Sequence, residues 1–286
     1  MPKTKTIISA SRRTDIPAFY WEWFQNQLRN GYVDVPNPLY KDKIARVDLT
    51  PEEIHSIVLW SKDMRNVINN PGLINNYNLY FQYTITGYNK LLEPNVPDYH
   101  TSIETLKAMR EQYDAKQFNI RFDPIVISTN GDLYPNPKNP VQARLDMFER
   151  LLNDLHELDM DDCRLTTSFM QLYGHVRTRM EETKCWYKEL TPAEEMEIMG
   201  KMSEIARKYN RDIYMCANDR FLNAGMDNVK KGHCIDGDIL EELFGKVSKA
   251  KDGSQRKECG CIKSRDIGSY QHECFFKCMY CYARKD

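Results

Sequence analysis

Long hydrophobic runs are missing from this sequence, and so is any excess of charge of one sign. No run approaches the roughly eighteen apolar residues of a membrane-spanning helix, so we expect no membrane partner. The formal net charge is -1, so the overall charge does not favour nucleic acid or an anionic surface, although a nucleic-acid substrate stays open. No apolar stretch follows a basic start near the N-terminus, and we therefore expect a cytoplasmic protein.

Internal repeats, low-complexity segments and a Gly-rich phosphate loop are also lacking. The first strand-like run, residues 6–11, is followed by Arg12 and Arg13 rather than by glycines, which argues against a dinucleotide-binding fold. What the chain does have is 286 residues, 41% of them hydrophobic. That is enough to bury the core of one large α/β domain or of two small ones.

Strand-like and helix-like segments alternate along the chain in six units. Such successive crossovers build a parallel sheet, as an open doubly wound sheet or as a partial barrel. Thr50 and Thr191 each begin a capping box with proline in the next position, and we expect a helix after each. We predict strands at residues 6–11, 57–60, 79–86, 118–122, 163–168 and 212–216, and helices from Pro17 to Phe24, after Thr50, and near 102–112, 140–155, 191–209 and 236–244.

Polar residues follow several of the predicted strands. The carboxyl ends of parallel strands are where barrel enzymes build their active sites, so these residues are candidates for the rim of a site. Arg12 and Arg13 would bind a cofactor carboxylate or an anionic substrate, or else pair with Asp15 and Asp123. Arg12, Arg13, Arg121 and Asp123 are the candidate catalytic residues; Ser11, Ser61, Lys62 and Ser168 are the candidate cofactor-binding residues, and Thr86 is a further rim position.

Nine cysteines need an explanation, because a chain of this size needs no disulfides to fold and the cytosol is reducing. Their concentration near the C-terminus points to metal or redox chemistry. Cys274, Cys278 and Cys281 follow one another with the spacing C-x3-C-x2-C, which can hold three corners of a cubane iron–sulfur cluster and leave the fourth iron open. A structural zinc site that borrows His272 is the alternative.

In this motif Tyr280 occupies the position before the last cysteine, so that the stretch reads C-x3-C-x-aromatic-C. It resembles the signature of the radical S-adenosylmethionine superfamily. The resemblance implies a partial (β/α)6 TIM-like barrel, a catalytic 4Fe–4S cluster and S-adenosyl-L-methionine as cofactor. It also implies reductive cleavage to a 5′-deoxyadenosyl radical, hydrogen abstraction from a substrate that the sequence does not identify, and an electron donor such as a flavodoxin or ferredoxin. Tyr280 would line the adenine of the cofactor or simply pack.

The whole chain resembles an uncharacterised family, a domain of unknown function with the three-cysteine motif at the C-terminus. It is also distantly similar to spore photoproduct lyase-type repair enzymes. In typical superfamily members the motif follows the first strand, and Gly-Gly-Glu often follows the second strand; this chain has neither feature. The stretches that carry the family resemblance are Ser9-x-Ser11-Arg12-Arg13-Thr14-Asp15-Ile16-Pro17, Leu59-Trp60-Ser61-Lys62-Asp63, Arg121-x-Asp123-Pro124 and Asp266-Ile267-Gly268.

Four other cysteines form a second candidate metal site. Cys216, Cys234, Cys259 and Cys261 could hold an auxiliary 4Fe–4S cluster or a zinc ion, with His233 as a neighbour. Because metal binding would also order the tail, we predict a barrel domain over residues 1–247 and a cysteine-rich iron–sulfur extension over residues 248–286. Cys163 and Cys185 are isolated, which favours a structural role.

Two functions remain at this point. The first is a radical S-adenosylmethionine enzyme with one catalytic and one auxiliary cluster. The second is a non-catalytic iron–sulfur or zinc protein that carries electrons or binds a partner. The fourth ligand at Cys274, Cys278 and Cys281 separates them, because an open iron favours the enzyme and a complete site favours the carrier.

Overall fold

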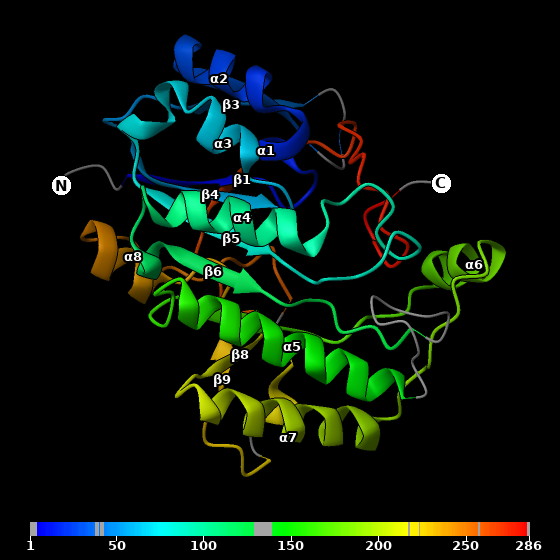
Figure 1. The fold of residues 1–286 in the computed structure, drawn as a ribbon. Helices are drawn as coiled ribbons and strands as arrows, with labels where there is room; N and C mark the ends of the chain where they lie inside the picture. Colours follow the sequence, from blue (N-terminus) through cyan, green and yellow to red (C-terminus); the bar gives the residue numbers. More distant parts are fainter. Residues whose placement is uncertain are drawn as a thin grey trace. The chain divides into compact units, whose positions relative to one another are not determined.

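The structure is a computed structural model that describes residues 5–37, 40, 43–128, 139–216, 218–222, 224–256 and 258–284. Its main feature is a large parallel sheet (Figure 1) with the strand order β10-β1-β4-β5-β6-β7-β8-β9. The two end strands are not paired with each other in the described residues, so the sheet is open. The strands are β1 Thr6–Ala10, β4 Ile54–Ser61, β5 Leu79–Thr84, β6 Phe118–Arg121, β7 Arg164–Thr167, β8 Ile213–Cys216, β9 Val229–Gly232 and β10 Arg265–Asp266.

The predicted α/β class is confirmed, and each of the six predicted strands is present. These six, from β1 through β4, β5, β6 and β7 to β8, are neighbours in the order of the chain. The sequence did not predict the two outer strands. Strand β9 is a short run with two exposed lysines at its centre, and β10 is only two residues long.

Helices cover the segments between strands, and their beginnings follow capping rules. Asp15 caps α1 by accepting a hydrogen bond from the Ala18 amide, and the predicted capping box of Thr191 and Glu194 begins α7. The helices are α1 Ile16–Phe19, α2 Trp21–Asn30, α3 Arg65–Asn69, α4 Tyr99–Arg110, α5 Pro140–Glu157, α6 Gly174–Glu182, α7 Pro192–Lys208 and α8 Gly237–Phe244, with 3-10 turns at Gly72–Asn76, Ala115–Gln117 and Asp219–Phe221. Among the described residues, no helix is long and apolar enough to cross a membrane.

The helix predicted after Thr50 is wrong. The amides of Glu53 and Ile54 both donate to the Thr50 carbonyl, at 3.1 and 3.2 Å, and this single turn leads directly into β4. Only three residues separate Thr50 from the strand, which is too few for a helix to propagate beyond its first turn.

The chain divides into two compact units, which we describe one at a time. Unit 1 comprises Met1–Tyr83, Gln117–Asn119 and His233–Phe275, and unit 2 comprises Thr84–Lys116, Ile120–Gly232 and Phe276–Asp286. The tail predicted as one extension therefore contributes residues to both units. The boundary falls inside the three-cysteine motif, after Phe275, and assigns Cys216 to unit 2 but Cys234, Cys259 and Cys261 to unit 1.

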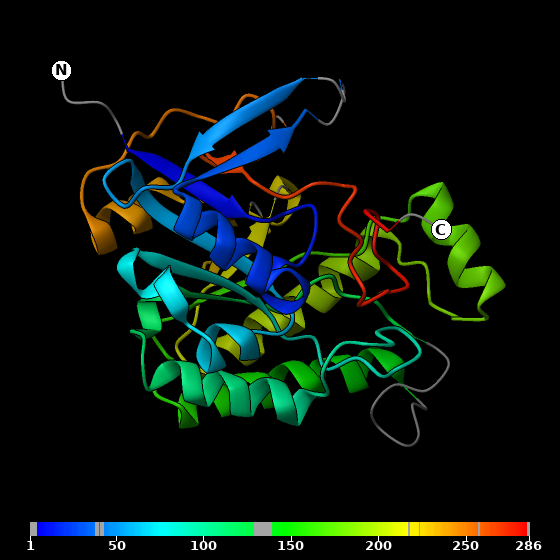
Figure 2. The same cartoon turned by 90° about the horizontal axis from the view of Figure 1, so that it is seen from above.

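In unit 1, β1 and β4 form the buried centre, where Ile8, Val58 and Leu59 are fully buried. Strand β10 pairs parallel with β1, which sets Ser9 opposite Asp266. A separate antiparallel pair, β2 Tyr32–Pro36 and β3 Ile44–Asp48, is visible as the two-stranded sheet in Figure 2. The pairing of β10 with β1 brings Arg265 and Asp266 beside the carboxyl half of the first strand.

In unit 2, helices α5 and α7 lie side by side (Figure 1). The apolar stripe of α5, with Phe148, Leu151 and Leu155, is fully buried. The Phe148 ring lies 5.2 Å from the ring of Phe122, which directly follows β6. These contacts fix the end of β6 and the segment after it, where Arg121 and Asp123 lie.

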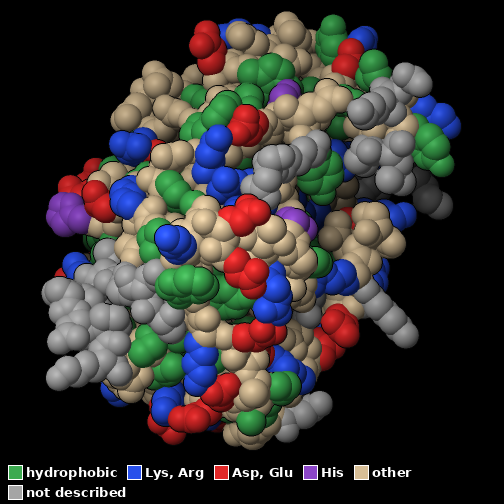
Figure 3. All heavy atoms as spheres, turned by 90° about the vertical axis from the view of Figure 1, so that its right-hand side faces the viewer, with side chains coloured by type: hydrophobic (Ala, Val, Ile, Leu, Met, Phe, Trp, Pro, Cys, Tyr) green, Lys and Arg blue, Asp and Glu red, His purple; other side chains and the backbone are tan. Residues whose placement is uncertain are grey.

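Acidic and basic side chains are interspersed on the surface that Figure 3 shows. The described residues include exposed ion pairs, such as Lys208 with Glu149 at 2.7 Å and Lys201 with Glu197 at 2.6 Å. Exposed pairs of this kind add little stability.

Candidate functional site

Three of the four cysteines predicted for the second metal site come together in unit 1. Cys234, Cys259 and Cys261 are all buried, and Cys261 Sγ accepts a hydrogen bond from the Ile235 amide at 3.4 Å. Hydrogen bonds of the Cys261 thiol with Cys234 and Cys259 raise the pKa of Cys261. The hydrogen bond from Cys261 lowers the pKa of Cys259 to about 6. The three sulfur atoms thus form one connected group.

The loop between Cys259 and Cys261 lies against an imidazole. A Cβ atom at Gly260 would stand 2.2 Å from His233 Nε2, so only glycine allows this approach. The other ring nitrogen, Nδ1, is 3.6 Å from the Asp236 carboxylate. His233 therefore lies against the loop that joins Cys259 and Cys261. Within the described part of the chain, no three His, Cys, Asp or Glu side chains are already arranged to coordinate one metal ion.

The end of the first strand is organised around Asp266. Its carboxylate accepts hydrogen bonds from Ser9 Oγ at 3.0 Å, Ser11 Oγ at 2.7 Å and the Arg12 amide at 2.8 Å. Gly268 packs so closely that an added Cβ would stand 2.0 Å from Ser11 Oγ. The stretch Asp266-Ile267-Gly268 thus holds the strand end, and Ser11 is already engaged by it.

The two adjacent arginines diverge. The Arg12 guanidinium lies over the Trp60 ring, 5.3 Å from its centroid, and its charge contributes to lowering the pKa of Cys259, after the hydrogen bond from Cys261. Arg13 donates to the Gly268 carbonyl at 2.9 Å and lies over Tyr270. Arg12 thus acts on the three-thiol group, whereas Arg13 holds the segment that leads to the motif.

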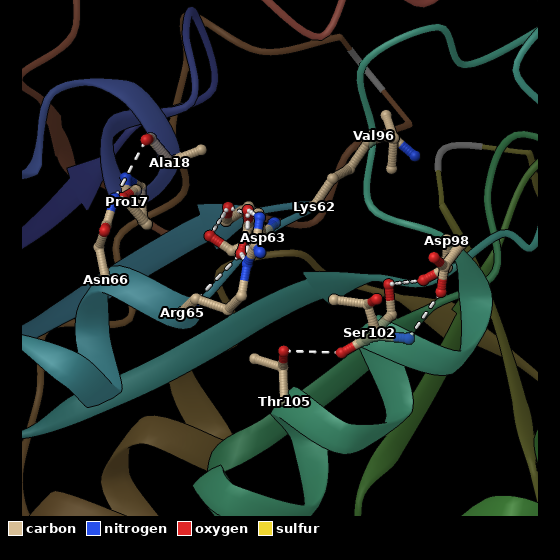
Figure 4. A network of polar contacts seen from close by, with 12 residues as sticks. Pro17, Ala18, Lys62, Asp63, Arg65, Asn66, Val96, Asp98, Ser102 and Thr105 are labelled. Carbon is tan, nitrogen blue, oxygen red and sulfur yellow. Dashed lines mark hydrogen bonds and ion pairs between the residues drawn. The ribbon is translucent and has the colours of Figure 1, made fainter.

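Asp15 is buried at the end of β4. Its carboxyl accepts hydrogen bonds from Ser61 Oγ at 2.7 Å and from the Lys62 amide at 2.9 Å. Burial raises the pKa of Asp15 to about 7. Nearby, the Arg65 guanidinium forms an ion pair with Asp63 at 2.6 Å. The side-chain amide of Asn66 donates to the backbone carbonyls of Pro17 and Ala18 in α1 (Figure 4).

Cys274, the first cysteine of the motif, is half-buried in unit 1. Its neighbourhood is aromatic: Tyr20 donates to the Glu273 carbonyl at 2.8 Å, and its ring stacks on His272 at 4.8 Å. Burial and then the charge of Cys274 raise the pKa of Tyr20. The His272 side chain is therefore placed by stacking on Tyr20.

The other two motif cysteines lie in unit 2 in one tight turn. The Cys281 amide donates to the Cys278 carbonyl at 3.2 Å. Two further hydrogen bonds attach the segment to the loop after β5: Met279 N to Leu92 O at 2.9 Å, and Asn95 N to Phe276 O at 3.3 Å. Figures 1 and 2 both show the red C-terminal coil beside this loop. The turn therefore lies on the connection that follows the carboxyl end of a parallel strand.

Arg179 of α6 fixes the same turn. Its side chain is buried, and Nη1 donates to the carbonyls of Met279 at 3.1 Å and Cys281 at 2.8 Å, while Nη2 donates to Arg284 at 3.1 Å. One guanidinium thus holds three carbonyl groups of the tail. It also places a positive charge beside Cys278 and Cys281.

Tyr280 belongs to a buried polar network. Its hydroxyl donates to the Glu93 carboxylate, which also accepts from Thr86 Oγ1 at 2.8 Å. Burial and the charge of Glu93 raise the pKa of Tyr280 well above its ordinary value. The Tyr280 ring lies 5.9 Å from the Tyr88 ring. The aromatic position of the motif is thereby tied to the predicted rim residue Thr86.

Arg121 and Asp123 form a buried ion pair at the end of β6, with 2.5 Å between Nη2 and Oδ2. Ser168 Oγ donates to the same carboxylate at 3.2 Å. Three predicted residues therefore meet in unit 2. Cys216 ends β8, and Cys163 accepts from Arg211 at 3.1 Å; none of the nine cysteines is in a disulfide.

Sequence reasoning missed four residues that organise these groups. Asp266 was recognised only as part of a resemblance, and Arg179 and Glu93 contact the motif from positions distant in the chain. The position of Arg144 in the sequence could have indicated its burial, because it lies four residues before Phe148 and seven before Leu151, on the buried face of α5. A charged residue on an apolar stripe is seldom placed there by packing alone.

Comparison with known proteins identifies the family. The family model described as a domain of unknown function, DUF1848, matches residues 7–283, so the chain belongs to this family. No curated protein and no solved structure matches it.

Proposed function

We propose that this chain is a radical S-adenosylmethionine enzyme. The observation that carries the proposal is the three-cysteine motif, two of whose thiols lie in a turn fastened to the loop after β5. The donor set fits the group: three thiolates can hold a 4Fe–4S cluster with one iron open. Cys278 is buried and Cys281 half-buried, and the charge of Arg179 favours anionic ligands in that turn.

When bound and reduced, the cluster would supply the electron that cleaves S-adenosyl-L-methionine and so provides the 5′-deoxyadenosyl radical for hydrogen abstraction from the substrate. The residues of the chain itself would hold and orient the cluster and the substrate. Arg179 and the loop at residues 92–95 fix the motif turn, and Tyr280 closes one side of it through Glu93. Arg121, Asp123 and Ser168 would contact the substrate.

We also propose that the sheet is a partial (β/α)6 barrel. Its six predicted strands are neighbours in chain order, whereas a doubly wound sheet reverses its order at a switch point. In such a barrel the residues at the strand ends share one face. Ser11 and Ser61 would position the strand ends through Asp266 and Asp15, and Lys62, Arg12 and Arg13 would face anionic groups.

For the second site we propose an auxiliary 4Fe–4S cluster or a zinc ion held by Cys234, Cys259 and Cys261; Cys216, the fourth ligand that the sequence predicts, belongs to unit 2. The contact among the three thiols in unit 1 supports a shared ion. The positive charge of Arg12 would offset part of the negative charge of the thiolates. A flavodoxin or ferredoxin in the cytoplasm would supply electrons.

An electron paramagnetic resonance experiment tests the open iron. Anaerobically reconstituted protein, reduced with dithionite, should change its cluster spectrum when S-adenosyl-L-methionine is added. The Cys278→Ala variant should lose this cluster, whereas Cys163→Ser, a change at a buried cysteine outside both groups, should keep it. A spectrum indifferent to S-adenosyl-L-methionine would favour the non-catalytic iron–sulfur or zinc protein instead.

A further inference from the structure

The side chain of Arg144, near the beginning of α5, is buried inside unit 2, with 4% of its surface exposed. Its Nη1 donates to the Thr86 carbonyl at 2.5 Å. The guanidinium is held between two rings, with Cζ 4.0 Å from the Tyr88 centroid and 3.7 Å from the Phe122 centroid. Aromatic rings therefore fix the plane of the guanidinium group.

The remaining edge of this guanidinium has no partner. Nε and Nη2 of Arg144 are both buried, and neither has a hydrogen-bond acceptor among the described residues. Burial of a charged donor without an acceptor is costly, so such a group is retained where a ligand completes it. Nε and the adjacent Nη2 are the two parallel donors that bind a carboxylate in a bidentate manner.

The charges around Arg144 favour one kind of anion. Glu93 contacts the same residue, Thr86, but at its hydroxyl, and the described residues place no carboxylate in an ion pair with Arg144. A ligand with a single negative charge would neutralise the guanidinium. A phosphate dianion would leave an excess of negative charge close to Glu93.

We infer that the Nε/Nη2 edge of Arg144 binds the carboxylate of a small-molecule ligand. The Tyr88 ring contacts the guanidinium and lies 5.9 Å from Tyr280 of the cysteine motif. The assignment of this ligand as the enzyme's substrate rests on the proposed function; the carboxylate site itself does not. The carboxylate belongs either to the substrate or to S-adenosyl-L-methionine, and the experiment separates these two sources.

The probe is acetate, with acetamide as its neutral isostere and with sodium chloride at matched ionic strength. Acetate at about ten times its dissociation constant should raise the midpoint of thermal unfolding of the reconstituted protein by about 2 °C or more, and acetamide should not. Arg144→Lys keeps the charge but loses the two parallel donors, so the acetate shift should disappear. Arg150→Lys, an exposed position on the same helix, should retain it.

Equal shifts with acetate, acetamide and chloride in the unsubstituted protein would overturn the inference, even if Arg144→Lys does not fold. An unchanged acetate shift in a folded Arg144→Lys protein would also overturn it. If this variant binds S-adenosyl-L-methionine as well as the parent, the carboxylate is the substrate's; a tenfold or greater loss of affinity assigns it to the cofactor. An acetate shift in protein that cleaves no cofactor would refute the proposed function but keep the site.

Discussion

Asp15 combines a structural role with an unusual pKa at the residue scale. It caps α1 and accepts a hydrogen bond from the Ser61 hydroxyl, yet burial raises its pKa from an ordinary 3.8 to about 7. Between these two values the folded chain binds a proton that the unfolded chain has released. The free energy of unfolding therefore falls as the pH rises through this window.

Replacing Asp15 with asparagine should remove this pH dependence, because asparagine also caps helices but does not ionise. At about 1.4 kcal/mol for each pKa unit, the parent should lose at most about 4 kcal/mol of unfolding free energy relative to Asp15→Asn between pH 4 and pH 7. Unfolding by urea across this range measures it. Parallel curves for the two proteins would show that Asp15 does not titrate there.

Gly268 is a second residue whose identity the structure explains, because Ser11 Oγ occupies the space of a Cβ atom at 2.0 Å. Gly268→Ala should lower the free energy of unfolding by about 1–3 kcal/mol through overpacking. Gly253→Ala is the matched control, since nothing lies within 4 Å of its added Cβ. Equal unfolding free energies for both variants would contradict the close approach.

At the scale of elements, α6 matters through the contact of Arg179 with the motif turn. Arg179→Met removes three hydrogen bonds to tail carbonyls, so the tail should loosen and the reconstituted protein should hold less iron. Arg177→Met, on the same helix, breaks only an exposed pair with Glu189 and should leave the iron content unchanged. Identical iron contents in the two variants would show that Arg179 does not hold the motif.

The strands show which parts of the sheet the sequence pattern could predict. The runs that became β1 and β4 to β8 are rich in β-branched and aromatic residues and were predicted. The β2–β3 pair was missed although Asp34 in β2 alternates with buried valines, which is the period-2 pattern of a strand with one exposed face. Strand β10 is stabilised by its partner β1, which its own two residues cannot reveal.

The candidate sites were predictable to the same extent. Spacing alone led to the prediction of a cluster site at Cys274, Cys278 and Cys281, because these three cysteines lie close together in the chain. The supporting contacts of Arg179 and Glu93 with the tail join residues about one hundred or more positions apart, and single-sequence patterns do not report tertiary contacts of this kind.

At the scale of the whole molecule, the C-terminal residues after β9 are divided between the two units. In unit 1, Asp266 accepts hydrogen bonds at the end of β1. In unit 2, the Met279 amide donates to the loop after β5.

The formation of 5′-deoxyadenosine from S-adenosyl-L-methionine tests the central claim most directly. Anaerobically reconstituted protein reduced with dithionite should produce it, and Cys278→Ala should not, because that variant lacks one of the three thiolates that hold the cluster. Protein with an intact cluster that yields no 5′-deoxyadenosine under the same conditions would contradict the assignment.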